Sequence, residues 1–151
     1  MEISIKISQD RYGVTSEHIK KKAKIILDAL ECPDGELSVL IVDDSGIAGL
    51  NKRYLGRSGP TNVLAFPMQE GPFGTINPNL LGDVVISLDT AASEAENAGI
   101  SVESRLDRLL IHGILHLFGF DHEKTPEQSK TMEIKEEQLL QLLRGYASEG
   151  Q

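Results

Sequence analysis

The sequence predicts a single α+β domain spanning residues 1–151, with about four strands packed against about five helices. Short segments that suit β-strands alternate along the chain with longer segments whose apolar residues recur at helical spacing. The 151 residues, 40% of them hydrophobic and 25% charged, have the size and composition of one globular domain. No internal repeat, low-complexity linker or second core interrupts this pattern.

The first elements are two strands with a helix between them. Glu2–Ile7 alternates polar and apolar residues, as half-buried strands do. A helix follows, with apolar residues at helical spacing up to Leu30 and a capping side chain from Thr15 or Ser16. Leu37–Val42 is a dense run of leucine and β-branched residues, which is typical of a buried strand.

A helix, a strand and a loop are predicted next. Asp44 or Ser45 begins a short helix that extends to about Tyr54. Thr61–Phe66 is a short strand that ends at a proline. Residues 70–79 are rich in Gly, Pro and Asn, so they form a loop or a connection between strands.

One more strand and three helices complete the prediction. Asp83–Ser87 is the fourth strand, and Ala91–Ala98 is a helix that a glycine ends. A longer helix begins at Ser101 or Glu103 and reaches Phe118. The last helix has a proline in its first turn. Its apolar face consists of Met132, Ile134, Leu139, Leu140 and Leu143.

Composition and charge argue against several classes of protein. Cys32 is the only cysteine, so no internal disulfide is possible and a reducing cytoplasm is the expected compartment. The N-terminus has no signal-peptide pattern, and the longest apolar run, Leu109–Phe120, is too short to cross a bilayer. We expect no membrane association and no nucleotide cofactor. The net charge of −8 argues against a general nucleic-acid binder, so any contact with RNA requires a local basic patch.

Some residues with reactive or charged side chains have a simple structural interpretation. His18 is expected to be a surface residue, and the run Lys20-Lys21-Lys22 is expected to be a solvated helix face. Cys32 is expected to be a small buried hydrophobic residue and not a nucleophile.

Three histidines close together in the sequence are the main candidates for a functional site. His112 and His116 are four residues apart, so on a helix they lie about one turn apart on the same face. Gly119 can adopt the left-handed conformation that ends a helix and reverses the chain, which would return His122 towards them. Three histidines with an open fourth position form the ligand set of a catalytic zinc ion. The sequence therefore predicts a metal cleft at the end of a central helix.

One zinc ion (Zn2+) is the expected cofactor, although nickel, cobalt or iron could occupy the same three imidazoles. The alternative is that the histidines are hydrogen-bonded core residues. The helix around them is apolar on nearly every side, so it is expected to be buried. Two buried imidazoles both need polar partners, and one shared metal ion supplies them together.

The histidine spacing also matches the ligand pattern of metzincin proteases, which carry a glutamate directly after the first histidine as general base. Gly113 occupies that position here, so the base for peptide hydrolysis is missing. Asp121 and Glu123 are close enough in sequence to move a proton instead. Asp121 could equally orient a histidine or cap the end of the helix.

The same region resembles the YbeY family of endoribonucleases, also called rRNA maturation factors. The resemblance covers about Leu37 to Leu143 and is carried by several separate motifs in the same order. These motifs are Leu50-Asn51, PTNVLAFP at 60–67, LGDVVIS at 81–87, the histidine segment 112–122, Asp121-His122-Glu123, Met132-Glu133 and Glu136.

The resemblance implies a small mixed sheet with helices packed on it and a histidine-bound zinc ion in a cleft. It also implies cleavage of single-stranded RNA, a role in maturation of small-subunit (16S) ribosomal RNA, and ribosome quality control in the bacterial cytoplasm. The expected partners are this RNA and the small ribosomal subunit or its assembly proteins. The oligomeric state leaves no pattern in the sequence.

One departure from the family concerns RNA binding. The family usually has an arginine directly after the aromatic residue of its LNxxY segment, whereas this chain has Leu55 after Tyr54. Arg53 and Arg57 flank that position and are the candidates for binding the substrate. The candidates for catalysis are Arg57, which would stabilise extra negative charge, and Asp121, which would move a proton.

Three functions are compatible with these patterns. The leading hypothesis is a zinc-dependent endoribonuclease, in which zinc polarises a phosphodiester or activates water or the 2′-hydroxyl of the RNA. The alternative is a non-catalytic, zinc-containing ribosome-assembly factor, which Leu55 and the net acidity favour. A metalloprotease fits the ligand spacing but lacks its base.

Overall fold

The computed structural model describes residues 3–8, 12–68, 79–120 and 125–149. Within these ranges the chain forms four strands and five helices, which confirms the predicted α+β fold. The predicted loop at 70–79 lies almost entirely outside the described residues. In chain order the elements are β1 (Ile3–Ile7), α1 (Ser16–Ala29), β2 (Glu36–Val42), α2 (Asp44–Leu55), β3 (Val63–Pro67), β4 (Leu80–Ser87), α3 (Leu88–Ala98), α4 (Val102–Leu117) and α5 (Pro126–Glu149).

The strands form one mixed sheet in the order β1-β2-β4-β3. β1 and β4 both pair in parallel with β2, and β3 pairs antiparallel with β4 at one edge. Leu37, Val39 and Ile41 of the inner strand β2 are each 3% exposed or less. Ser38, Leu40 and Val42, on the other face of the strand, are half-buried. The run at 37–42 is therefore fully buried on one face and partly covered on the other.

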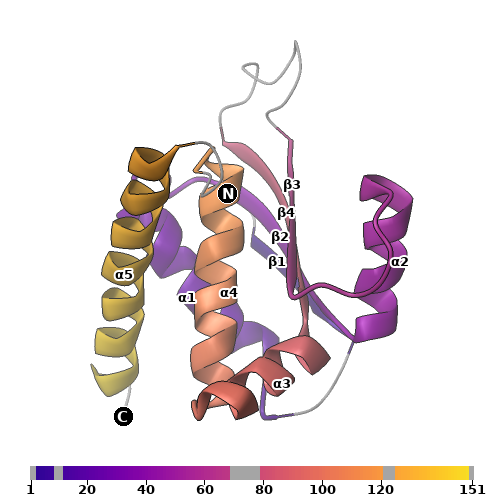
Figure 1. The fold of residues 1–151 in the computed structure, drawn as a ribbon. Helices are drawn as coiled ribbons and strands as arrows, with labels where there is room; N and C mark the ends of the chain where they lie inside the picture. The colour runs from indigo at the N-terminus through magenta and orange to yellow at the C-terminus, as the bar shows by residue number, and fades with distance from the viewer. Residues whose placement is uncertain (1–2, 9–11, 69–78, 121–124, 150–151) are drawn as a thin grey trace.

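The helices cover the two faces of the sheet unequally. Figure 1 shows α1, α4 and α5 on one side of the sheet, α3 across one end, and α2 on the opposite side. The main core lies between the sheet and the larger group of helices. A smaller cluster between α2 and the sheet consists of Ile47, Leu64 and Val85.

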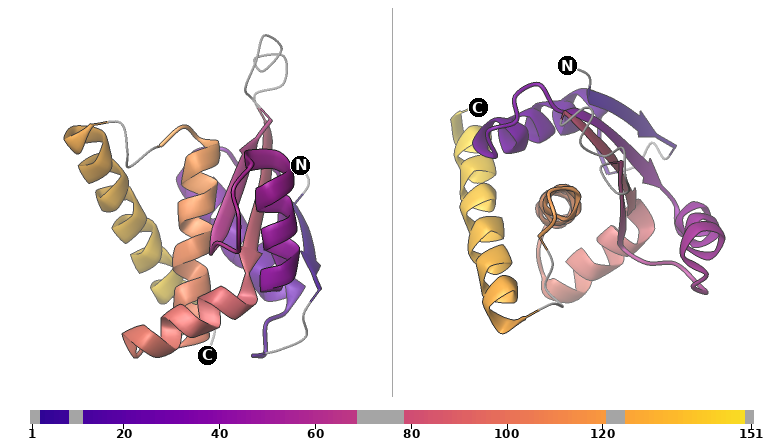
Figure 2. Two further views of the ribbon diagram at one scale, coloured as in Figure 1. Left: turned by 45° about the vertical axis from the view of Figure 1, so that its right-hand side comes forward. Right: turned by 90° about the horizontal axis from the view of Figure 1, so that it is seen from above.

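α4 is the central helix of the larger layer, and the view from above shows it end-on between the sheet and α5 (Figure 2). Burial of each leucine or isoleucine stabilises the fold by about 1.5–3 kcal/mol, so packing on several sides fixes the position of α4. The buried residues of α4 are Leu106, Leu109, Leu110, Ile111, Gly113, Ile114, Leu115 and Leu117.

No helix within the described ranges is long and apolar enough to cross a membrane.

A glycine allows α4 to approach the sheet closely. A Cβ atom at Gly113 would lie 2.6 Å from Val84 Cγ1 and 3.2 Å from Val63 Cγ2. Carbon atoms in contact prefer about 3.5–4.0 Å, so position 113 faces β3 and β4 without room for a side chain.

β4 begins with a bulge that requires a second glycine. The register between β2 and β4 shifts there, because Glu36 pairs with Leu80 whereas Leu37 pairs with Gly82. Gly82 has a φ of +137°, and a Cβ atom on it would lie 2.2 Å from the Phe66 carbonyl oxygen. Only glycine combines this backbone conformation with this close approach of β3.

Several predicted details differ from the structure. β4 begins at Leu80 and not at Asp83, and β3 spans Val63–Pro67 and not Thr61–Phe66. α3 begins at Leu88 and not at Ala91, because Ser87 Oγ accepts a hydrogen bond from the Thr90 amide at 3.2 Å and caps the helix earlier. β4 therefore continues directly into α3. Ile134 is 52% exposed, while the other apolar residues predicted on the inner face of α5 are buried.

Candidate functional site

His112 and His116 lie side by side on α4, as their spacing predicts. Their ring centroids are 4.6 Å apart, with 66° between the ring planes. Their Nε2 atoms face each other at 3.1 Å. Both side chains are half-buried, so they are held by the packing of α4 and still reach the surface.

Two facing imidazole nitrogens at this distance can share either a hydrogen bond or a metal ion. A hydrogen bond needs a proton on one of the two Nε2 atoms and a lone pair on the other. Two nitrogens bound to one tetrahedral zinc ion, with Zn–N bonds of about 2.0–2.1 Å, are separated by about 3.3 Å. The separation of 3.1 Å therefore fits two of the three predicted ligands of a zinc ion.

Glu136 of α5 contacts the opposite side of the His112 ring. Its Oε1 lies 2.9 Å from His112 Nδ1, and its side chain is only 13% exposed. Glu136 belongs to one of the motifs that carry the family resemblance, and its sequence context predicts no role for it. Its position four residues after the buried Met132 places it one turn further along the same side of α5. This spacing is the sequence pattern that could have indicated an inward-facing carboxylate.

α4 ends in the turn that Gly119 was predicted to form. Gly119 has a φ of +91°, and its amide donates to the His116 carbonyl at 3.0 Å. The Phe120 amide donates to the Leu115 carbonyl at 3.1 Å. These two bonds form the Schellman motif, which reverses the chain at the end of a helix.

A hollow of about 250 Å³ borders this end of α4, where the sequence predicted a cleft. The predicted ligand His122 and the candidate Asp121 lie outside the described residues, so their roles stay predictions. Among the residues that the structure describes, no three histidine, cysteine or carboxylate side chains form a group able to hold a metal ion. The hollow is lined by Phe118, Gly119, Phe120, Gln128 and Thr131.

The residue after the first histidine cannot act as a general base. Position 113 faces Val84 and Val63 of the sheet, with a Cβ-to-methyl distance as short as 2.6 Å. The glutamate that metzincin proteases carry at this position would have no space here.

The structure does not bring Arg53 to the histidine pair. Arg53 is exposed on α2, and its guanidinium carbon lies 5.6 Å from the centre of the Tyr54 ring. α2 and α4 lie on opposite sides of the sheet (Figures 1 and 2). The sheet therefore separates Arg53 from His112 and His116.

Arg57 follows α2 in an exposed loop that a buried asparagine holds. Asn51 is 4% exposed and donates from Nδ2 to the Gly59 carbonyl at 3.0 Å. The Arg57 amide donates to the Asn51 carbonyl at 3.3 Å. Leu55, in the position of the family arginine, is 45% exposed. The Leu50-Asn51 motif thus shapes the loop that carries Arg57.

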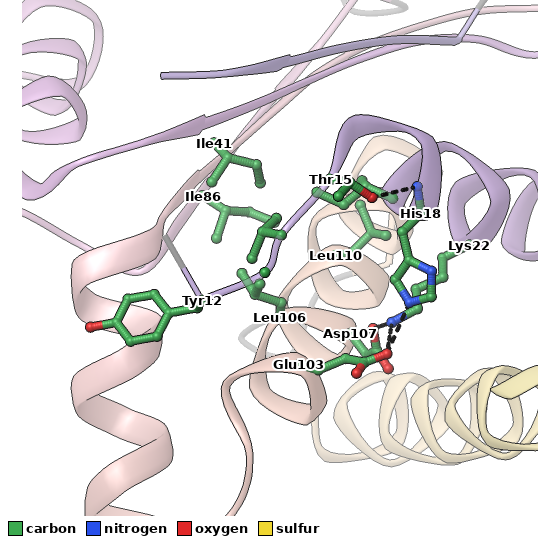
Figure 3. A pocket seen from close by; sticks show the side chains of 13 residues that line it. Tyr12, Thr15, His18, Lys22, Ile41, Ile86, Glu103, Leu106, Asp107 and Leu110 are labelled. Carbon is green, nitrogen blue, oxygen red and sulfur yellow. Dashed lines mark hydrogen bonds and ion pairs between the residues drawn. The ribbon is translucent and has the colours of Figure 1, made fainter. Parts of the chain in front are cut away.

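A cavity of about 260 Å³ lies beside the first half of α4, away from the histidine pair. Figure 3 shows apolar side chains, among them Ile41, Ile86 and Leu106, on one side of it. A polar cluster closes its other end, and this cluster consists of His18, Lys22, Glu103 and Asp107. This polar cluster joins α1 to α4 through charged groups.

Lys22 contradicts the prediction that the whole run Lys20-Lys21-Lys22 is solvated. It is 3% exposed, and its Nζ lies 2.9 Å from Glu103 Oε1 and 2.6 Å from Asp107 Oδ1. A buried ammonium group needs such partners, and its place three residues after Ile19 puts it on the inner face of α1. His18 is exposed as predicted, although its Nε2 lies 2.9 Å from Glu103 Oε1.

This cluster predicts a dependence of stability on pH. The hydrogen bond from Lys22, followed by that from His18, lowers the pKa of Glu103 from 4.5 to about 2. Because the folded state depresses this pKa, the stabilising contribution is present above about pH 4.5 and is lost as the pH falls towards 2. Burial raises the pKa of Asp107 more than Lys22 lowers it, so Asp107 acts in the opposite sense.

The variant Glu103→Gln isolates the contribution of Glu103. We expect the difference in unfolding free energy between parent and variant to be largest above pH 4.5 and to shrink towards pH 2. Solvent screening keeps the effect small, since the Glu103 side chain is 57% exposed. Urea unfolding followed by circular dichroism at several pH values measures it, and a difference that stays constant from pH 2 to pH 6 would contradict the assignment.

Cys32 has no feature of a reactive thiol. It is half-buried, and burial followed by the nearby charge of Asp34 raises its pKa. A nucleophilic cysteine needs a lowered pKa, so Cys32 does not compete with the histidine pair as a catalytic centre.

Comparison with known proteins agrees with the resemblance that the sequence motifs suggest. A family model described as Endoribonuclease YbeY matches residues 4–144. The chain is 50% identical over 144 residues to the Endoribonuclease YbeY of Geobacter sulfurreducens, covering 95% of this chain and 96% of that protein. It is 44% identical over 147 residues to the Endoribonuclease YbeY of Syntrophus aciditrophicus, covering 97% and 92%.

The fold is also similar to a solved structure. The solution structure of TM1509 from Thermotoga maritima matches with a TM-score of 0.71 and 28% identity, covering 98% of this chain and 93% of that one. The matches in sequence and in structure both extend over nearly the whole chain. On these grounds the chain belongs to the YbeY family of endoribonucleases, whose substrate is RNA.

Proposed function

We propose that this chain is a zinc-dependent endoribonuclease that cleaves single-stranded RNA. Its role would be the maturation of small-subunit (16S) ribosomal RNA and ribosome quality control in the cytoplasm, with the small subunit or its assembly proteins as partners. The observation that carries the proposal is the 3.1 Å separation of the facing Nε2 atoms of His112 and His116. This distance suits two ligands of one tetrahedral ion, in a chain that belongs to an endoribonuclease family.

His112, His116 and His122 would hold the ion, with a fourth position open to the substrate. When bound, zinc supplies a Lewis acid that polarises a phosphodiester or activates water or the 2′-hydroxyl. Nickel, cobalt or iron would fit the same ligands. Asp121 is the candidate for moving the proton, or for orienting a histidine.

The two arginines have different parts in this proposal. Arg53, across the sheet from the histidines, would contact RNA away from the scissile phosphate. Arg57 also starts from the α2 side of the sheet, because its amide bonds to the Asn51 carbonyl of α2. As the candidate for stabilising negative charge during cleavage, it would have to reach past the edge strand β3 to the phosphate.

The second candidate is a zinc-containing ribosome-assembly factor without catalytic activity. The observation in its favour is Leu55, exposed on α2 where the family usually has an arginine. The net charge of −8 points the same way, because it disfavours an extended RNA interface. In this case the ion would stabilise the fold and take no part in a reaction.

Cleavage of a purified small-subunit RNA precursor tests the proposal. We expect the zinc-loaded parent to cleave it and His116→Ala to lose both zinc binding and cleavage. The matched control is His18→Ala, which removes a histidine on α1 and should leave both properties unchanged. Zinc at 100 times its Kd stabilises a folded protein by about 2.7 kcal/mol, so zinc should raise the Tm of the parent and not that of His116→Ala.

Two outcomes would decide against a metal-centred nuclease. Cleavage by His116→Ala, with its zinc content shown to be zero, would overturn the role of the ion. No cleavage by a zinc-loaded parent, together with binding to the small subunit, would favour the assembly factor.

A further inference from the structure

We propose that Glu136 is a positioning residue for the histidine pair, because its carboxylate holds His112 in the tautomer and orientation that direct Nε2 towards the metal. This inference rests on the proposed metal-binding function of His112 and His116. It gives α5 a part in a site that was predicted from the segment 112–122 alone.

The contact joins two helices that are distant in sequence. His112 Nδ1 and Glu136 Oε1 are 2.9 Å apart across 24 positions of the chain. The exposed fraction of the side chain is 29% for His112 and 13% for Glu136. A carboxylate that is largely removed from water needs a hydrogen-bond donor, and the ring Nδ1–H is such a donor.

The chemistry of the carboxylate selects one form of the imidazole. An ionised carboxylate only accepts hydrogen bonds, so Nδ1 of His112 must carry a proton. In the neutral ring the lone pair then lies on Nε2, which is the nitrogen that faces His116 Nε2 at 3.1 Å. The opposite tautomer would carry a hydrogen at Nε2 and could not bind a metal through that atom.

Attachment of α5 to the rest of the fold does not require this contact. The apolar face of α5 already attaches the helix to the core. Its residues Met132, Leu139, Leu140 and Leu143 are each 4% exposed or less. Loss of these buried groups would cost far more stability than loss of one hydrogen bond. Variants of Glu136 should therefore fold, and their effect on His112 can be measured directly.

The experiment compares Glu136→Leu and Glu136→Gln with two controls, Glu133→Leu and Glu133→Gln. Glu133 is exposed on the same helix, so each control makes the same change of charge without contact with the histidines. The tautomer of His112 is read by nitrogen-15 NMR of the imidazole in metal-free protein, at a pH where the ring is neutral. Zinc affinity is measured by competition with a chromophoric chelator, and thermal melting confirms that each variant folds.

We expect the parent and both Glu133 variants to carry the proton of His112 on Nδ1. Glu136→Leu should populate the Nε2–H form and bind zinc about 10- to 100-fold more weakly. Glu136→Gln keeps an oxygen acceptor, so it should retain the Nδ1–H form and lose less affinity than Glu136→Leu.

A folded Glu136→Leu variant in which His112 still carries its proton on Nδ1 would overturn the inference. A changed tautomer with unchanged zinc affinity would overturn it as well. If the parent itself bound no zinc, the proposed function would fail, and the NMR result on the metal-free protein would still report whether Glu136 sets the tautomer.

Discussion

Gly82→Ala is expected to abolish stable folding. The new Cβ atom would lie 2.2 Å from the Phe66 carbonyl oxygen, and a φ of +137° is unfavourable for any residue with a side chain. The atom it meets belongs to the backbone of β3, so relief requires β3 and β4 to separate. We expect a loss above about 4 kcal/mol, a large part of the 5–15 kcal/mol by which a domain of this size is stable.

Gly99→Ala is the matched control for this prediction. Gly99 also has a positive φ, +69°, but no atom lies within 4 Å of the position that a Cβ would take. This variant therefore carries backbone strain alone, which costs about 1–2 kcal/mol. Urea unfolding monitored by circular dichroism measures both losses, and equal losses in the two variants would show that contact with Phe66 is unimportant.

Gly113→Ala is expected to destabilise the protein although alanine is the better helix former. Alanine in a helix interior gains about 1 kcal/mol over glycine. Against this, the new methyl would lie 2.6 Å from Val84 Cγ1, and overpacking of a core typically costs about 1–3 kcal/mol. We expect a net loss of up to about 2 kcal/mol. If the proposed zinc site exists, its affinity should fall as well, because α4 must move with His112 and His116.

A double-mutant cycle measures how much of this loss comes from contact between position 113 and Val84. Val84→Ala removes the nearest methyl group that Gly113→Ala would meet, Cγ1 at 2.6 Å, together with Cγ2 at 3.2 Å, and leaves Val63 Cγ2 at 3.2 Å. The double variant should therefore lose less stability than the sum of the single losses. Gly49→Ala, in the interior of α2 with no atom within 4 Å of its Cβ position, should be neutral or stabilising by up to about 1 kcal/mol. Strictly additive losses at 113 and 84 would contradict the contact.

Local patterns were sufficient to predict the elements of this fold. Helix spacing placed His112 and His116 on one face of α4, and the glycine after that helix indicated its Schellman turn, because both depend on residues within one or two turns. Proline in the first turn similarly located the start of α5 at Pro126. The mixed sheet came from the family resemblance, since strand order depends on contacts that no local pattern encodes.

The features that the sequence did not predict all depend on distant contacts. Lys22 is buried because Glu103 and Asp107, more than 80 positions away, are brought against α1. The contact of Glu136 with His112 depends in the same way on how α5 packs on α4. The location of Arg53 could not be predicted either, because the sequence does not indicate which face of the sheet α2 covers.

The position of α4 has a consequence for genetics. The same helix fills the core and carries the histidine pair, so a substitution that shifts its packing also shifts His112 and His116. A screen for loss-of-function alleles should therefore recover changes at buried positions of α4 and β4 alongside changes at the histidines. Alleles of the first kind should be suppressed at low growth temperature, whereas alleles that remove a histidine should be null at every temperature.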